Sequence, residues 1–207
     1  RTKGSVGECL FGEARLMGKD GKILSSEGEG ELIFSASTMM EGYLKGETPF
    51  LEFEGKKWFP TGDLAKKDSS GCYEIIGRKK NIIISGGRNI SPEEINNTLL
   101  ESEFVNDCVS FGVPDKNWGE RSISAVIRTL KGKESIDCKA YLLDYLSKKL
   151  SPYKVPRDII FLESFPKNRS GKPDSVRIRE DYLGLGGGLN LNPKKSIEGL
   201  KDQVIKL

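Results

Sequence analysis

The feature that most constrains the fold is a change in sequence pattern close to Gly77. Before it, glycine-containing turns such as "GKDGK", "SSEGEGE" and "KDSSG" separate short runs in which apolar and polar residues partly alternate. Runs of this kind are typical of antiparallel strands and not of helices. We expect strands at residues 13–17, 30–36, 49–55 and 72–77, with a hairpin turn at Gly55. Residues 1–77 are therefore predicted to form a small β-rich subdomain, either a sheet or a barrel.

After Gly77, strand patterns and helix patterns alternate. The run "NIIIS" at residues 81–85 predicts a buried strand. Ser91, Pro92 and Glu94 have the spacing of a capping box with proline at the first helical position, which predicts a helix over residues 92–102. The apolar face of this helix is expected to contain Ile95, Thr98 and Leu99.

The rest of the chain continues this alternation. Further strands are expected at residues 105–113, 121–130 and 158–164, and an ordered non-helical link at "SPYKVP". A second amphipathic helix is expected from Asp137 to Leu150, and a short helix after the loop "ESFPKNRSGKPDS". The apolar face of the second helix is predicted to consist of Ala140, Leu143, Leu146 and Leu150.

These patterns predict an α+β fold class with two domains. The β-rich subdomain of residues 1–77 is followed by a compact α/β domain at residues 78–182. Residues 183–207 begin with "LGLGGGLNLNPKKS", which is Gly-rich and poorly patterned, so we expect a link and a terminal segment there.

The absence of histidine from the chain restricts its chemistry. Ser-His-Asp and Cys-His nucleophilic sites are excluded, as are His-based acid–base pairs and most transition-metal sites. Any reaction would depend on Lys, Arg, Asp, Glu, backbone dipoles or a metal ion carried by a substrate. Nucleotide phosphates suit such a set of groups.

Charge and apolar patterning exclude further classes. Lys and Arg exceed Asp and Glu by only three, so the charge does not indicate a nucleic-acid partner. No apolar run is long enough to cross a bilayer, and "RTKGSVGECL" lacks the apolar centre of a signal peptide. We expect a cytoplasmic protein whose thiols fill its core and form neither disulfides nor a zinc site. The four scattered cysteines are Cys9, Cys72, Cys108 and Cys138.

Three local features are candidates for function, and each also has an ordinary structural explanation. Asp63 lies in "TGD", which is typical of a simple turn. Gly86 and Gly87 lie between a strand and a capped helix, where paired glycines permit either close approach of a ligand or a tight turn. Lys172 lies in a polar loop, where lysines usually face solvent.

The order and spacing of these features carry more information than any one of them. "WFPTGDLA", "GCYEIIGRKKNIIISGGRNISPEEI", "WGE", "LSPYKVP" and "PKNRSGKPDS" together resemble the C-terminal third of the adenylate-forming (AMP-binding) superfamily, as does "EGELIFSASTMMEGYLKGET" before them. The resemblance covers residues 4–180 and favours acyl-CoA synthetases. It implies that residues 78–182 are the lid domain of these enzymes.

The resemblance implies a two-step ligase that joins a carboxylic acid to coenzyme A with ATP and Mg²⁺. By the family pattern, Asp63 holds the ribose hydroxyls of the nucleotide, and Arg78 reaches the same ribose–phosphate region. Lys172 matches the lysine of the adenylation step, in which an ammonium offsets the repulsion between carboxylate and phosphate. Its loop is expected to be flexible, so that the lysine can be delivered to a site elsewhere. No metal bound by this chain itself is predicted.

Other matching positions concern the second step. Lys80 matches the hinge about which the lid domain turns between the two half-reactions. Gly86 and Gly87 would line the tunnel for the thiol of coenzyme A, where larger residues would block thioester formation and spare adenylation. Trp118 matches a position near the coenzyme A arm, although packing explains a partly buried tryptophan equally well. Nearby Lys116 and Arg121 suit either coenzyme A phosphates or a solvated face.

Some segments depart from the family pattern, namely Asn96 in "EEIN", Cys72 in "SSGCYEIIG" and "PDS" after Lys172. The phosphate-binding loop and the acyl pocket of the family have no counterpart in these residues. We therefore expect the chain to be a C-terminal fragment that needs the missing N-terminal domain and makes no acyl-adenylate alone. The sequence names no particular acid. A carrier-protein phosphopantetheine acceptor and a non-catalytic nucleotide- or partner-binding module remain the alternatives.

Overall fold

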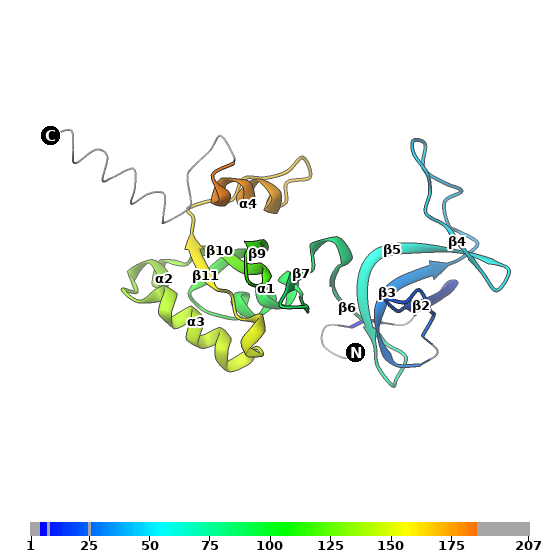
Figure 1. The fold of residues 1–207 in the computed structure, drawn as a ribbon, viewed down its shortest axis with the longest axis horizontal. Coiled ribbons are helices and arrows are strands. Elements are labelled where there is room, and N and C mark those ends of the chain that lie inside the picture. The colour runs from blue at the N-terminus through cyan, green and yellow to red at the C-terminus, as the bar shows by residue number, and fades with distance from the viewer. Residues whose placement is uncertain (1–4, 8, 25, 186–207) are drawn as a thin grey trace. The chain divides into compact units, whose positions relative to one another are not determined.

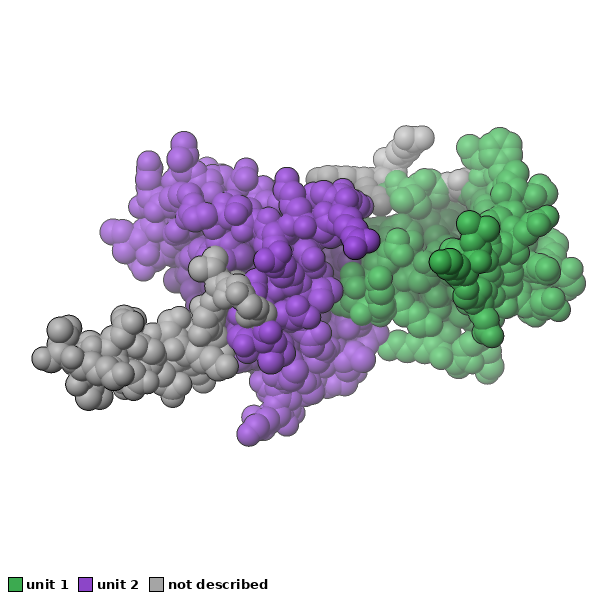
Figure 2. Space-filling view, turned by 90° about the horizontal axis from the view of Figure 1, so that it is seen from above, with its two compact units in different colours: residues 1–81 green, residues 82–207 purple. Residues whose placement is uncertain are grey.

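The computed structural model describes residues 5–7, 9–24 and 26–185. The chain forms two compact units, residues 1–81 and residues 82–207 (Figure 2). The Gly-rich link and terminal segment expected from residue 183 onward lie outside the described residues from residue 186. Sheets and helices are both present, which confirms the α+β fold class.

The N-terminal unit is an antiparallel sheet. Its strands run in the order β1, β6, β5, β3, β2, and β4 pairs with β5 (Figure 1). Every pairing in this sheet is antiparallel. The strands are β1 (Ser5–Gly7), β2 (Glu13–Met17), β3 (Gly28–Ser35), β4 (Leu51–Phe53), β5 (Lys56–Lys67) and β6 (Tyr73–Arg78).

The segment "TGD" is not the simple turn that the sequence indicates. It lies inside β5, which continues from Lys56 to Lys67 through Pro60 and Gly62. Opposite Leu32 of β3, the register shifts, so that residues 61–63 of β5 bulge between the pairs Pro60–Ile33 and Leu64–Glu31. A bulge tolerates proline and glycine and changes the direction of the side chains that follow it.

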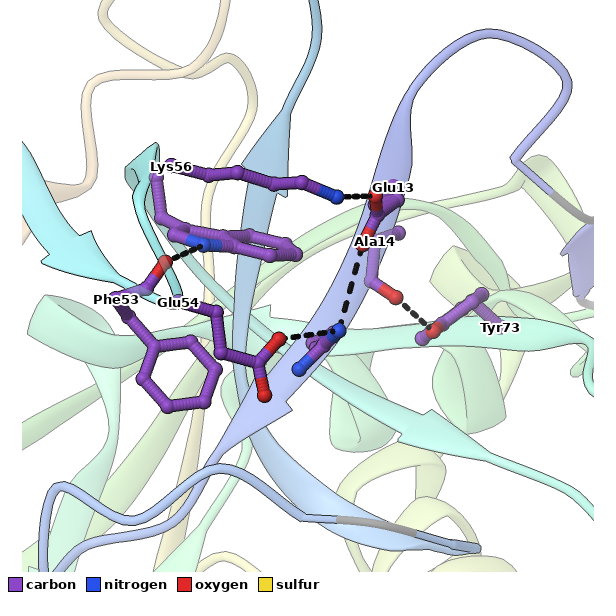
Figure 3. A network of polar contacts seen from close by, with 8 residues as sticks. Glu13, Ala14, Phe53, Glu54, Lys56 and Tyr73 are labelled. Carbon is purple, nitrogen blue, oxygen red and sulfur yellow. Dashed lines mark hydrogen bonds and ion pairs between the residues drawn. The ribbon is translucent and has the colours of Figure 1, made fainter.

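The core of the N-terminal unit is small. A cluster of Leu16, Ala65 and Tyr73 is buried at its centre, and Trp58 is fully buried elsewhere in the sheet. Polar contacts surround these residues (Figure 3): the Tyr73 hydroxyl donates to the Ala14 carbonyl at 2.6 Å, and Trp58 Nε1 donates to the Phe53 carbonyl at 3.2 Å. These bonds satisfy the polar ends of the aromatic side chains.

The C-terminal unit combines a mixed sheet with four helices among its described residues. The strands are β7 (Ile83–Ser85), β8 (Arg88–Ile90), β9 (Val105–Asp115), β10 (Gly119–Arg128) and β11 (Asp158–Phe161). The helices are α1 (Pro92–Leu100), α2 (Leu130–Glu134), α3 (Cys138–Lys149) and α4 (Ser175–Leu183). Strand β11 runs parallel to β10, and β9 and β7 pair with β10 in the antiparallel sense.

Helices cover both faces of this sheet, which places a core on each side. One cluster joins Ile95 and Leu99 of α1 and Leu142 and Leu146 of α3 to the sheet. The other joins α4, through Ile178 and Tyr182, to the opposite face. The unit therefore has three layers, and its sheet is buried on both sides.

The start of α1 agrees with the sequence. Ser91 is the N-cap, its hydroxyl accepts a hydrogen bond from the backbone N–H of Glu94, and Pro92 occupies the first turn. Ile95 and Leu99 are fully buried, which confirms the predicted apolar face. The cap fixes where α1 begins, because it satisfies an N–H that has no partner inside the helix.

Three details of the predicted pattern are wrong. The buried face of α3 contains Cys138, Leu142 and Leu146, whereas Ala140 is exposed. The strand expected at residues 81–85 is short, and Ile84 is 56% exposed on it. The link "SPYKVP" contains a 3₁₀ turn at Pro152–Lys154.

All four cysteines are free thiols, and Cys108 and Cys138 are buried. This agrees with thiols as core residues in the C-terminal unit. Among the described residues, the helices are too short or too polar for any of them to span a membrane.

Candidate functional site

In the N-terminal unit, Asp63 and Arg78 form an ion pair. They are opposite each other in the register of β5 and β6, and Arg78 Nε lies 2.6 Å from Asp63 Oδ1. The Asp63 side chain is 24% exposed and that of Arg78 is 53% exposed. The carboxylate is therefore held in one orientation while it stays accessible to a ligand.

The bulge in β5 explains how Asp63 reaches this position. Gly62 has φ +73°, a conformation that residues with a side chain rarely adopt. The Thr61 hydroxyl donates to the Leu32 carbonyl at 2.8 Å and accepts from the Asp63 N–H at 3.1 Å. Thr61 thus bridges the two strands where their ladder is interrupted and fixes the backbone of Asp63.

A second ion pair lies next to the first and joins strand β3 to the residue directly after β6. Lys79 Nζ lies 2.7 Å from Glu31 Oε2, and the Glu31 side chain is only 8% exposed. Glu31 is opposite Leu64, the residue after Asp63. Sequence analysis missed both residues, because Glu31 is one of two glutamates in β3 and nothing local distinguishes it from the exposed Glu29.

Lys80 follows in a 3₁₀ turn, Lys79–Asn81, and is exposed. Among the described residues no hydrogen bond or ion pair holds its side chain. The boundary between the two compact units falls directly after Asn81. Lys80 therefore lies one residue from the point where the chain passes from one unit to the other.

In the C-terminal unit, Gly86 and Gly87 form the turn of the β7–β8 hairpin. Their φ angles are +56° and +74°, and the pair Ser85–Arg88 closes the turn. Two-residue hairpin turns of this type need positive φ at both central positions. The glycines thus lie between strand β7 and helix α1, as the sequence indicates, and strand β8 separates them from the helix.

Trp118 lies against this turn. The N–H of Gly86 donates to the Trp118 carbonyl at 2.8 Å, and the indole is 50% exposed. Trp118 belongs to the turn between β9 and β10, where Asp115 Oδ1 accepts from its N–H at 3.1 Å. The guanidinium of Arg157 lies 5.8 Å from the centre of the indole ring.

The charges and N–H groups around Asp115 favour the charged form of its carboxyl, the group that accepts hydrogen bonds within this turn. The N–H of Asn117 lowers the pKa of the Asp115 carboxyl, and the Trp118 N–H and the charges of Arg121 and Arg157 act in the same direction. The carboxylate is therefore charged well below neutral pH. It keeps the turn that carries Trp118 closed throughout the neutral range.

Lys172 is exposed on the loop between β11 and α4, in agreement with its polar sequence. The loop is nevertheless ordered by hydrogen bonds. Asn168 Oδ1 accepts from the N–H groups of Ser170 at 2.9 Å and Lys172 at 3.1 Å, and the Asn168 N–H donates to the Lys172 carbonyl at 2.8 Å. The side chain of Lys172 itself has no hydrogen bond or ion pair among the described residues, so a loop shaped by its own hydrogen bonds carries an unpaired ammonium. The flexibility of this loop stays a prediction.

The structure thus groups the candidate residues into three sets. Asp63 and Arg78 are together in the N-terminal unit, and Gly86, Gly87 and Trp118 are together in the C-terminal unit. Lys172 is the third set, on the loop between β11 and α4 of the C-terminal unit. Within the same described ranges, no cluster of three or more Cys, Asp or Glu residues has the geometry to hold a metal ion.

Comparison with known families identifies part of the chain. Residues 94–172, from the first turn of α1 to the exposed lysine, match the family model "AMP-binding enzyme C-terminal domain". These residues are therefore similar to that family of domains. The match ends at Lys172, the residue that the sequence motif had singled out.

Similarity to curated relatives extends beyond residues 94–172 and covers most of the chain. The chain is 30% identical over 183 residues to a long-chain-fatty-acid–CoA ligase of Mycobacterium tuberculosis, covering 88% of this chain and 35% of that protein. It is 35% identical over 180 residues to a feruloyl-CoA synthase of Amycolatopsis, covering 86% and 36%. The chain therefore spans about a third of the length of these curated relatives.

A solved structure has a similar fold. ATP-bound MatB from Rhodopseudomonas palustris superimposes with a TM-score of 0.75 at 30% sequence identity, covering 86% of this chain and 36% of that one. Residues 94–172 and the strands before them are thus similar in both sequence and fold to these proteins.

Proposed function

We propose that this chain is the C-terminal portion of an ATP-dependent acid–thiol ligase that adenylates a carboxylate and then transfers the acyl group to coenzyme A. The family match and the CoA-ligase relatives support this proposal. The observation that carries it is the free, exposed ammonium of Lys172 on a shaped loop at the end of the matched residues.

In the first step, a carboxylate oxygen bonds to the α-phosphorus of ATP, and the bond from that phosphorus to pyrophosphate breaks. Two anions must approach each other, so their repulsion adds to the barrier. The ammonium of Lys172, placed between them, offsets this repulsion and stabilises the charge of the transition state. Mg²⁺ bound to the ATP phosphates would add to the same effect.

Asp63 and Arg78 orient the nucleotide in this proposal. Since Asp63 Oδ1 pairs with Arg78, the other carboxylate oxygen is the one that we expect to accept from the ribose hydroxyls. Charge-assisted hydrogen bonds of this kind are about twice as strong as neutral ones. The ion pair holds the carboxylate ready before the nucleotide arrives.

In the second step, the thiol sulfur of coenzyme A bonds to the acyl carbon, the bond from that carbon to the AMP oxygen breaks, and the thiol proton passes to solvent. We propose that Gly86, Gly87 and Trp118 border the path of this thiol. Lys80 is the proposed hinge, since it is exposed and lies next to the boundary between the units.

The test is Lys172→Ala in the longer enzyme that contains this chain. Adenylation, measured as pyrophosphate exchange, should fall by roughly 10²- to 10³-fold, the usual effect of removing one such group. Thioester formation from supplied acyl-adenylate should persist. Lys167→Ala is the matched control, because Lys167 is an exposed lysine on the same loop.

Equal adenylation in the Lys172→Ala and Lys167→Ala enzymes would contradict the proposal and favour a non-catalytic binding module. The acceptor is tested in the same enzyme by supplying coenzyme A or a holo carrier protein. Coenzyme A is the acceptor that the named relatives favour. We also propose that the present chain alone forms no acyl-adenylate, and pyrophosphate exchange by the isolated chain would contradict this.

A further inference from the structure

A pocket lies in the C-terminal unit where strands β10 and β11 end. Its volume is about 380 Å³, which is within the usual range for small-molecule sites. Arg128 and Phe161, the last residues of the two strands, line one side, and residues 135–140 and Leu143 of α3 line the other. Strands β10 and β11 run parallel, and sheets of this kind commonly bind ligands at the carboxyl ends of their parallel strands.

The pocket is far from the β7–β8 turn. Gly119, at the start of β10, pairs with Ser85 beside that turn, whereas Arg128 is at the other end of the same strand. A strand of this length spans roughly 30 Å. The pocket also contains none of the residues that the proposed function uses.

Apolar side chains form much of the pocket wall. Phe161 and Leu143 are partly buried and pack against the core cluster between α1, α3 and the sheet, so their positions are fixed from below. Ile136, in the same lining, is 99% exposed. A ligand with an apolar body would remove the surface of these three side chains from water, which is favourable.

Arg128 supplies this pocket with a cation that has no acidic partner. Its guanidinium lies 4.4 Å from the centre of the Phe161 ring, and among the described residues no hydrogen bond or ion pair involves it. Two acids in this region already have partners, since Glu163 pairs with Lys133 and Asp158 pairs with Lys139. A guanidinium stacked on a ring keeps its N–H edge free, and this edge matches the two oxygens of a carboxylate.

The charges around the pocket favour an anion. Asp137 is a carboxylate of the lining, but it is exposed, so water and salt screen its charge, whereas Arg128 is half-buried. The charge of Arg128 also acts inside the pocket, because it opposes the rise that burial causes in the pKa of the Cys138 thiol. An anionic group beside Arg128 is therefore more favourable than a cationic one.

We propose that this pocket binds a small carboxylate with an apolar body. The carboxylate accepts two hydrogen bonds from the guanidinium of Arg128, and the apolar body covers Phe161, Leu143 and Ile136. This inference does not depend on the proposed function, and it adds a binding site to the C-terminal unit.

The experiment titrates the 207-residue chain with octanoate and follows its backbone N–H signals by NMR. Octanoate should bind with a Kd of roughly 1 mM, an ordinary affinity for a ligand of about ten non-hydrogen atoms. The signals of Arg128, Phe161 and residues 135–140 should shift. Octylamine, which has the same apolar chain and the opposite charge, should bind at least about tenfold more weakly.

Two variants test the site itself. Arg128→Gln should weaken octanoate binding at least about tenfold, the usual effect of losing hydrogen bonds to a charged group, and Arg128→Lys should weaken it less because the charge remains. Ala140→Leu keeps Arg128 and fills the pocket, so it should weaken binding by a similar factor. Ala140 is exposed, so the fold tolerates this change. Arg169→Gln, which removes an exposed arginine from the loop before α4, is the control and should leave the Kd unchanged.

Four results would overturn the inference. They are no binding at about 10 mM octanoate, ten times the expected Kd, shifts confined to residues outside the pocket, equal binding of octylamine, and an unchanged Kd in either Arg128→Gln or Ala140→Leu. The ligase proposal would stand in each case, because it uses none of these residues.

Discussion

The two units of this chain present their candidate residues in opposite ways. The N-terminal unit holds Asp63 and Glu31 in ion pairs on neighbouring strands. The C-terminal unit presents the ammonium of Lys172 from a loop, with no ion-pair partner among the described residues. Charges fixed on a sheet suit a binding site that is ready before the ligand arrives, whereas a free ammonium suits a group that is brought to its target.

The units also differ in how they are held together. The N-terminal unit has one cluster of three buried side chains and depends on ladder hydrogen bonds and surface ion pairs. The C-terminal unit has a buried cluster on each face of its sheet. The unit with the larger core is the one that carries the loop lysine and the glycine turn, so these features project from a rigid base.

The largest expected effect is the loss of stability when a buried leucine is truncated in the core of either unit. Leu142→Ala should lower the free energy of unfolding of the C-terminal unit by about 2–5 kcal/mol, because Leu142 is fully buried between α3 and the sheet. Leu16→Ala is the matched change in the N-terminal unit. The loss of unfolding free energy for Leu16→Ala should lie at the lower end of that range, because the small cluster around Leu16 can collapse more easily into the space left. Hydrogen exchange of each unit measures both, and an equal or larger loss for Leu16 would break the comparison.

A smaller effect is expected from the fixed charges. Asp63→Asn should reduce adenylation by roughly 100-fold, because the charge-assisted contacts to the nucleotide and the pair with Arg78 weaken together. ATP saturation kinetics of the longer enzyme measure this. Glu74→Gln, an exposed carboxylate on the adjacent strand, is the control. If both substitutions had the same effect, the N-terminal unit would have no specific role in nucleotide binding.

The smallest expected effect is a difference in thiol reactivity between the units. Cys108 and Cys138 are buried, whereas Cys9 and Cys72 are partly exposed, so Cys9 and Cys72 should react with a thiol reagent at least about tenfold faster. Mass spectrometry of the labelled peptides measures the rates. Similar rates at all four positions would show that the C-terminal core opens readily.

The pH dependence of the C-terminal unit follows from the same burial. Burial raises the pKa of Cys108 from 9.0 to about 12, with the charge of Asp107 adding to the effect. The unfolded chain therefore loses this proton at lower pH than the folded chain. The contribution of Cys108 to stability should be constant below about pH 9 and fall as the pH rises toward about 12. Cys108→Ala should reduce this fall, and an unchanged fall would show that other groups cause it.

Local patterns predicted most of the secondary structure. The start of α1 was readable because its cap, its proline and its first apolar residues are adjacent in sequence. The course of β5 was not, because Pro60 and Gly62 interrupt the strand pattern and are tolerated only at a bulge opposite β3. The buried face of α3 was also misjudged, since Ala140 and Leu143 fit a helical stripe as well as Cys138 and Leu142 do.

At the candidate site, too, the sequence reveals features that depend on adjacent residues and misses those that depend on distant ones. Lys172 and the glycine pair stand out in the sequence because their neighbours are unusual. Contacts between distant segments do not stand out: Glu31 meets Lys79, and Gly86 meets Trp118, only because the strands beside them pair. Contacts of this kind depend on strand register, which no local pattern in the sequence specifies.

The central claim is that the C-terminal unit supplies a different element to each half-reaction. Its most direct test measures both half-reactions in Lys172→Ala and Gly87→Leu forms of the longer enzyme. The account predicts that Lys172→Ala loses adenylation and retains thioester formation from supplied acyl-adenylate, and that Gly87→Leu does the reverse. Loss of the same step in both variants would contradict it.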